Sequence, residues 1–171
     1  MTEVVPSTEP VVEQDAISVR PMRIEHLGEV TDLFRNAGED ALHNRFFTLG
    51  DRVVAAHLDD LRAPSHPRCH IAFANGHIVG IVEMADLGKG TEEVAFLVAK
   101  GMHHHGIGTT LLSAAVADAR SRGVRTLVAD VLATNHLMLE VFRNAGASLS
   151  RDAGDVHVAL PVNATGSVHA D

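Results

Sequence analysis

Residues 92–110 read EEVAFLVAKGMHHHGIGTT, and this stretch decides the fold. Its apolar run up to Val98 predicts a buried strand, the glycines at 106 and 108 predict a loop, and the apolar spacing that follows predicts a helix over 108–122. The first N–H groups of such a helix have no partner within it, and the helix dipole attracts negative charge to that end. The stretch therefore predicts a binding site for a pyrophosphate.

The two loop glycines define what kind of phosphate site this is. Gly106 and Gly108 let the backbone approach phosphates without a Cβ in the way. No Gly-Lys-Ser or Gly-Lys-Thr follows, so the loop is not a Walker loop. The third glycine of the dinucleotide fingerprint is also missing, which excludes that motif as well.

Composition limits the class of protein. The chain has 171 residues, which suits one domain, and 46% of them are hydrophobic, enough for a core. A net charge of −8 argues against sequence-independent binding of nucleic acids, which depends on basic patches. We find no signal peptide and no apolar run long enough to cross a bilayer, and Cys69 is the only cysteine. These features lead us to expect a cytoplasmic protein with no membrane contact and no intrachain disulfide.

One domain is expected over residues 16–161. Residues 1–15 are acidic and contain two prolines, which predicts a disordered tail, and residues 162–171 predict a frayed end. Patterning within the domain predicts a strand at 17–20, a helix ending before Gly38, and a helical segment over 40–61 that is broken at Gly50. A hairpin with an Asn75-Gly76 turn follows. The remaining elements are expected at 92–98 (a strand buried on both faces), 108–122 (helix), 126–132 (buried strand), 135–145 (helix) and around 148 and 155–160 (a β pair).

This order of elements, with His103 followed by glycines at 106 and 108, resembles the GNAT superfamily of N-acetyltransferases over about residues 16–160. The resemblance implies an α/β fold of the α+β type, with a mixed central sheet and flanking helices. It also implies that two neighbouring parallel strands, 92–98 and 127–132, splay apart. Acetyl-CoA would be the co-substrate, with its pantetheine arm between the splayed strands.

Three short stretches narrow the resemblance to one group within the superfamily. LHNRFF at 42–47, EEVAFLV at 92–98 and ADVLATN at 129–135 look like elements of bacterial protein lysine acetyltransferases. Those enzymes acetylate a lysine of acyl-CoA synthetases and related proteins. Several of them carry an additional regulatory domain, for which the segment before Ile17 is too short. The resemblance places Arg45, Phe46 and Phe47 near the acceptor site, although helix packing is the simpler role for the two rings.

Glu93 is the expected general base. A lysine ammonium must lose a proton before it can attack a thioester, and a carboxylate beside apolar strand residues is suited to removing it. By resemblance, Glu93 matches the catalytic glutamate of protein acetyltransferases. Residue type alone equally allows a solvated strand end beside Glu92.

The cofactor-binding residues are expected on the strand, the loop and the next helix. Backbone groups of 96–98 would meet the pantetheine amide and the thioester carbonyl, whose developing charge fixed N–H donors stabilise. Loop histidines would contact phosphates through the backbone and, when protonated, through the side chain, although Arg or Gln is usual at 103 in the family. The full set is Phe96, Leu97, Val98, His103, His104, His105, Gly106, Ile107, Gly108, Thr109, Asn135 and Phe142.

Asn135 and Phe142 have alternatives. Asn135 matches a family asparagine that contacts the pantetheine arm, and it is also a good helix N-cap. Many GNAT enzymes have a tyrosine at the place of Phe142 that protonates the departing thiolate, and this chain has no tyrosine. The thiolate would then leave unaided, take a proton from water, or be served by another group, while Phe142 packs under the cofactor.

Metal binding and covalent catalysis are not expected. Metal ligands must converge on one point, whereas the adjacent residues His103, His104 and His105 point apart in an extended loop. His66, Cys69 and His70 form a second, interrupted group. Cys69 shows no sign of activation, so we expect direct attack without a covalent enzyme intermediate.

The sequence thus predicts an acetyl-CoA-dependent N-acetyltransferase with a protein partner that bears a reactive lysine. Two alternatives remain open. The first is a small-molecule amine N-acetyltransferase on the same fold, and the second is a non-catalytic CoA-binding sensor. The sequence gives neither the acceptor nor the oligomeric state.

Overall fold

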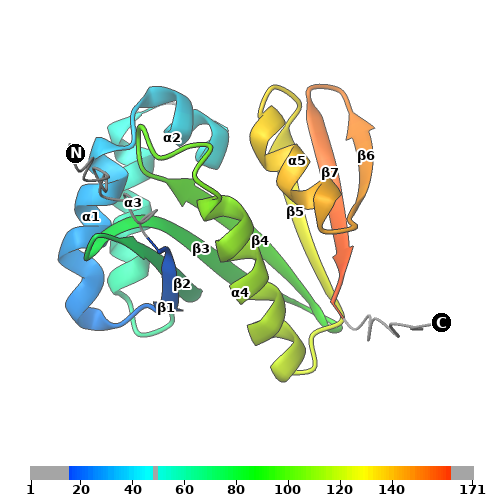
Figure 1. Ribbon diagram of the computed structural model, residues 1–171, viewed down its shortest axis with the longest axis horizontal. Coiled ribbons are helices and arrows are strands. Elements are labelled where there is room, and N and C mark those ends of the chain that lie inside the picture. Colours follow the sequence, from blue (N-terminus) through cyan, green and yellow to red (C-terminus); the bar gives the residue numbers. More distant parts are fainter. Residues whose placement is uncertain (1–15, 48–49, 163–171) are drawn as a thin grey trace, which may run out of the picture.

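The computed structural model describes residues 16–47 and 50–162 (Figure 1). The predicted tail at 1–15 and most of the predicted C-terminal tail, 163–171, lie outside the described residues. Val162, which the sequence assigned to that tail, is buried, and its backbone N–H donates to the carbonyl of Arg125 at 3.0 Å. The folded part therefore extends one residue past the expected boundary.

A seven-stranded sheet forms the centre of the molecule, with strand order β1-β2-β3-β4-β5-β7-β6. All neighbouring strands are antiparallel except β4 and β5. The fold is therefore α/β with a mixed sheet, as predicted. The strands are β1 (Ser18–Pro21), β2 (Arg68–Ala74), β3 (His77–Gly88), β4 (Thr91–Val98), β5 (Thr126–Leu132), β6 (Ser148–Asp152) and β7 (Asp155–Pro161).

Helices cover the two faces of the sheet (Figure 1). They are α1 (Leu27–Asn36), preceded by a 3-10 turn, α2 (Glu39–Phe46), α3 (Asp51–Arg62), α4 (Ile107–Ser121) and α5 (His136–Asn144). The break at Gly50 is confirmed, since this residue precedes α3 with a φ of 142°. The hairpin turn is also confirmed, because Asn75 and Gly76 both have positive φ.

Two apolar clusters hold these layers together. On one face, α4 and α5 pack on the sheet around residues such as Leu111, Phe142 and Val158. On the other face, α1 and α3 pack on β2, β3 and β4 around Phe34 and Ile81. No helix among the described residues is long and apolar enough to span a membrane.

The parallel strands β4 and β5 separate partway along their length. Their register pairs are Thr91 with Thr126, Glu92 with Leu127 and Glu93 with Val128. Beyond these pairs β4 continues to Val98 and β5 to Leu132 without further pairing between these described residues, so the predicted splay is confirmed.

The splay also corrects an expectation about burial. Residues 92–98 were expected to be buried on both faces, but Glu93 is exposed and Ala95 and Phe96 are only partly buried. All three residues border the cavity between β4 and β5.

The apolar spacing within 135–145 predicts a buried stripe of Leu137, Met138, Val141, Phe142 and Ala145, and the observed stripe of α5 differs from it. Leu137 is 38% exposed, whereas Leu139 and Phe142 are buried in the core. Residues 137, 138 and 141 line a cavity instead of packing fully into the core.

Candidate active site

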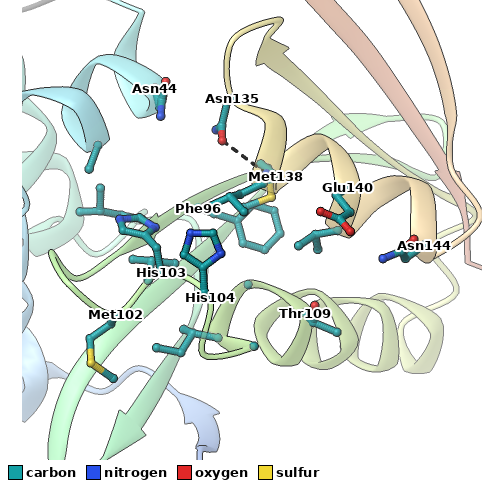
Figure 2. Close-up of a pocket in the computed structure, with 18 residues that line it drawn as sticks. Asn44, Phe96, Met102, His103, His104, Thr109, Asn135, Met138, Glu140 and Asn144 are labelled. Carbon is teal, nitrogen blue, oxygen red and sulfur yellow. Dashed lines mark hydrogen bonds between the residues drawn. The ribbon is translucent and has the colours of Figure 1, made fainter.

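Two neighbouring cavities lie at the splay. The first, which we call the loop cavity, has a volume of about 310 Å³ and lies between α2, the loop after β4, and the helices α4 and α5 (Figure 2). The predicted residues that line it are Phe96, Leu97, Val98, His103, His104, Gly106, Ile107, Gly108, Thr109 and Asn135. His105 and Phe142 are not among the lining residues of this cavity.

The start of α4 has the geometry of an anion site. Gly106 precedes the helix in the left-handed conformation with a φ of 75°, and no side chain caps this end. The N–H of Thr110 donates to the carbonyl of Gly106 at 3.0 Å and begins the helical hydrogen bonding. The first turn carries no acidic residue. Backbone donors at Ile107, Gly108 and Thr109 are thus available to a negative ligand.

Side-chain charge in the loop cavity is sparse. None of the described residues that line it is Lys or Arg, and Glu140 is its acidic member. The side chains that can carry a positive charge there are His103 and His104 (Figure 2). His104 has a φ of 70°, an uncommon conformation for a residue with a Cβ.

The second cavity, which we call the splay cavity, has a volume of about 170 Å³ and lies between β4 and β5, with the end of α2 beside it. Its polar residues include Glu93, Arg45 and Asp130. Its apolar walls include Phe142, which is fully buried and meets the ring of Phe96 edge-on at 5.8 Å between ring centroids.

The two adjacent glutamates have different environments. Glu92 is buried, and both of its carboxylate oxygens accept hydrogen bonds from Arg122, which also bonds Asp118. The hydrogen bonds with Glu92 raise the pKa of Arg122, and this effect is larger than the lowering of that pKa by burial. Glu93 points to the opposite face of β4, is exposed, and lines the splay cavity.

The two cavities meet, because Asn44, Phe96, Asn135 and Met138 line both of them. Asn135 caps α5, since its Oδ1 accepts from the N–H of Met138 at 3.3 Å (Figure 2). The cap role of Asn135 is confirmed, while its contact with the pantetheine arm stays a prediction. Asn44 approaches the junction from α2 and was not predicted from the sequence.

A buried ionic group that the sequence analysis missed lies beneath α2. Glu83 on β3 is 4% exposed and accepts a hydrogen bond from Arg45 Nη2 at 2.8 Å. His57 Nε2 lies 3.0 Å from the same carboxylate. Burial alone would raise the pKa of Glu83, but the hydrogen bond with His57 and the charge of Arg45 outweigh it and hold that pKa below its usual value. Arg45 is thereby fixed at the wall of the splay cavity, while Phe46 is partly buried against the core and Phe47 is 38% exposed.

The second histidine group of the sequence does not converge. Cys69 and His70 lie on opposite faces of β2, and His66 approaches the carbonyl of Pro67. Burial raises the pKa of the Cys69 thiol, which keeps it protonated. Among the residues that the structure describes, no group of three or more His, Cys, Asp or Glu is arranged to hold a metal ion.

Residues 31–147 match the acetyltransferase (GNAT) family, and the chain belongs to that family. It is therefore an enzyme of the acetyltransferase class. No curated protein sequence matches the chain.

Solved structures agree on the fold. The GNAT domain of S. lividans PAT is 24% identical, covers 90% of this chain and 99% of its own, and superposes with a TM-score of 0.70. The structure of yncA from Salmonella typhimurium with acetyl-CoA is 18% identical, with coverages of 92% and 100% and a TM-score of 0.66. A ribosomal-protein-alanine N-acetyltransferase from Brucella melitensis is 21% identical, with coverages of 83% and 97% and a TM-score of 0.63.

Proposed function

We propose that the protein transfers the acetyl group of acetyl-CoA to the ε-amine of a lysine in a partner protein, with Glu93 as the general base. The observation that carries the proposal is the meeting of the two cavities. The loop cavity ends at the residues it shares with the splay cavity, and Glu93 lines the latter. A base on one side thus faces the place where a thioester held in the other cavity would end.

The loop cavity suits the cofactor. The uncapped start of α4 would hold the pyrophosphate, because its backbone donors are available and no acid lies in the first turn. A Cβ at Gly108 would make only ordinary van der Waals contacts, at 3.6 Å from side-chain atoms of Met138 and Val141. Backbone groups of Phe96, Leu97 and Val98 border the same cavity and would bind the pantetheine amide.

The proposed reaction assigns each proton and bond. Glu93 removes a proton from the lysine ammonium, and the amine then attacks the thioester carbonyl carbon. Backbone N–H groups of β4 stabilise the charge that develops on the carbonyl oxygen. As the C–S bond breaks and the new amide forms, the nitrogen gives up its second proton to water. The thiolate takes a proton from water, since Phe142 offers none.

The test follows free thiol released from acetyl-CoA, with lysine peptides in one set and small amines in another. Glu93→Gln is expected to lower kcat by roughly 10²–10⁴-fold at saturating acetyl-CoA, the usual size of general-base catalysis. Glu25→Gln removes an exposed glutamate on the 3-10 turn and is the matched control with unchanged turnover. Equal rates for Glu93→Gln and wild type across the pH range would remove Glu93 from this role.

The same assay separates the alternatives. Thiol release with small amines and with no lysine peptide would assign a small-molecule acceptor. Binding of CoA with no release for any amine would identify a sensor, and would overturn the proposal.

A further inference from the structure

The strands β5, β7 and β6 leave one face of the sheet open. Their side chains alternate, so Val131, Val156 and Val158 are buried under α4 and α5. The opposite face carries the residues between them. We call this surface the open face and define it by Asp130, Leu132, Ser150, Asp152, Asp155 and His157.

The register places these residues in two rows. Asp130 lies opposite His157, which lies opposite Ser150. Leu132 lies opposite Asp155, which lies opposite Asp152. All six are exposed except Leu132, which is partly buried.

The open face continues into the splay cavity. Glu93 is the register partner of Val128, two residues before Asp130, so Glu93 and Asp130 project to the same side of the sheet. Asp130 itself lines the splay cavity. On this side, α1 and α3 cover β2, β3 and β4, and their cover ends before β5 (Figure 1). A chain entering the splay cavity from that end would therefore pass over the open face.

The fixed charges of the open face are negative. It carries three aspartates and, among its six residues, neither lysine nor arginine. Arg151 projects to the other face because side chains alternate along β6. His157 Nδ1 lies 2.9 Å from Asp130 Oδ1, which orients that carboxylate at the cavity mouth.

This charge pattern selects among possible occupants. A second copy related by a two-fold axis would bring aspartates against aspartates, which is unfavourable. A basic segment would bring opposite charges together. We infer that the open face binds arginines or lysines that flank the acceptor lysine in a partner protein, an inference that rests on the proposed function.

The test compares two peptides with one acceptor lysine each, one flanked by arginines and one by alanines. Wild type is expected to show a kcat/KM roughly tenfold higher for the arginine peptide at low salt, and the ratio should shrink as salt screens the charges. Asp152→Asn/Asp155→Asn should reduce the ratio to about threefold or less and leave the alanine peptide unchanged. The matched control, Asp32→Asn/Asp60→Asn, removes two exposed aspartates from α1 and α3 and should keep the wild-type ratio. An equal ratio in wild type and Asp152→Asn/Asp155→Asn would overturn the inference.

Two further measurements keep the inference independent of turnover. Binding of the labelled arginine peptide, followed by fluorescence anisotropy, should weaken in Asp152→Asn/Asp155→Asn even if no lysine peptide is acetylated. In that event the proposed function is wrong, while the binding of basic peptides to the open face is confirmed.

Analytical ultracentrifugation tests whether a second copy of the chain occupies the open face instead. A wild-type dimer that Asp152→Arg/Asp155→Arg dissociates would assign the open face to self-association and overturn the inference.

Discussion

Two adjacent glutamates show how the side of a strand decides the role of a residue. Glu92 and Glu93 are chemically identical, but β4 turns one toward α4 and the other toward the splay cavity. Arg122 and Asp118, both in the last turn of α4 or directly after it, complete a buried ionic cluster around Glu92. The cluster ties the end of α4 to the beginning of β4, next to the three register pairs that join β4 to β5.

Arg122→Met is expected to lower the free energy of unfolding by about 3–5 kcal/mol, because it leaves the buried Glu92 carboxylate without its partner. Urea unfolding followed by circular dichroism measures the change. The double variant Glu92→Gln/Arg122→Met removes both charges and should recover part of the loss. A double variant as unstable as Arg122→Met would contradict this account.

Glu83 predicts how stability depends on pH. Burial would raise the folded-state pKa of Glu83, but the hydrogen bond with His57 and the charge of Arg45 outweigh it and hold that pKa below its usual value. The carboxylate therefore stabilises the folded state above about pH 4.3, the ordinary value for glutamate. That contribution is lost as the pH falls below this value toward the folded-state pKa. Urea unfolding of Glu83→Gln between about pH 3 and pH 7 should show a shallower loss toward acid than wild type. Parallel curves would mean that Glu83 does not contribute.

Motifs in the sequence pointed to residues that line the two cavities, and sequence reasoning stopped where contacts are long-range. The structure shows that Glu93 lines the splay cavity, and its role as a base stays a prediction. Glu83 gave no signal, since its partners Arg45 and His57 come from two helices far away in the sequence. Asn44 was missed because its position at the junction depends on how α2 packs.

At the scale of the elements, most boundaries followed from local signals. The Asn75-Gly76 turn, the break at Gly50 and the loop before α4 all depend on glycine in conformations that few other residues adopt. Gly80 gave no such signal. A Cβ there would lie 2.9 Å from Ile107 Cγ2, so this glycine allows the start of α4 to pack on β3. That need is visible only once both elements are in place.

The loop before α4 predicts that its histidine side chains contribute to the affinity for CoA. No Lys or Arg is among the described residues lining the loop cavity, so His103 and His104 are the side chains there that can carry a positive charge. At about pH 6, calorimetry should give a Kd for CoA that is roughly three- to tenfold higher in His103→Gln/His104→Gln than in wild type. Equal Kd values would leave only the backbone role.

At the scale of the whole molecule, the sheet consists of two groups of strands, which are joined by a short stretch of pairing between β4 and β5. Strands β1 to β4 carry α1 to α3 on one face, while β5, β7 and β6 pack against α5, and α4 contacts both (Figure 1). Three register pairs connect β4 to β5 before the strands separate. The backbone of β4 beyond Glu93 therefore has a free edge toward the splay, which is where a ligand can form the bonds that a strand would otherwise form.

This arrangement predicts where acetyl-CoA slows hydrogen exchange. At short labelling times, amides of residues 94–98 and 106–110 should exchange more slowly in the complex, because the ligand bonds the free edge of β4 and the start of α4. Amides of β1 and β2, at the far end of the sheet, should be unchanged. Mass spectrometry of peptides from the labelled protein measures both regions in one experiment. Slowing spread evenly over the chain would indicate general stabilisation, and slowing confined to β6 and β7 would place the ligand elsewhere.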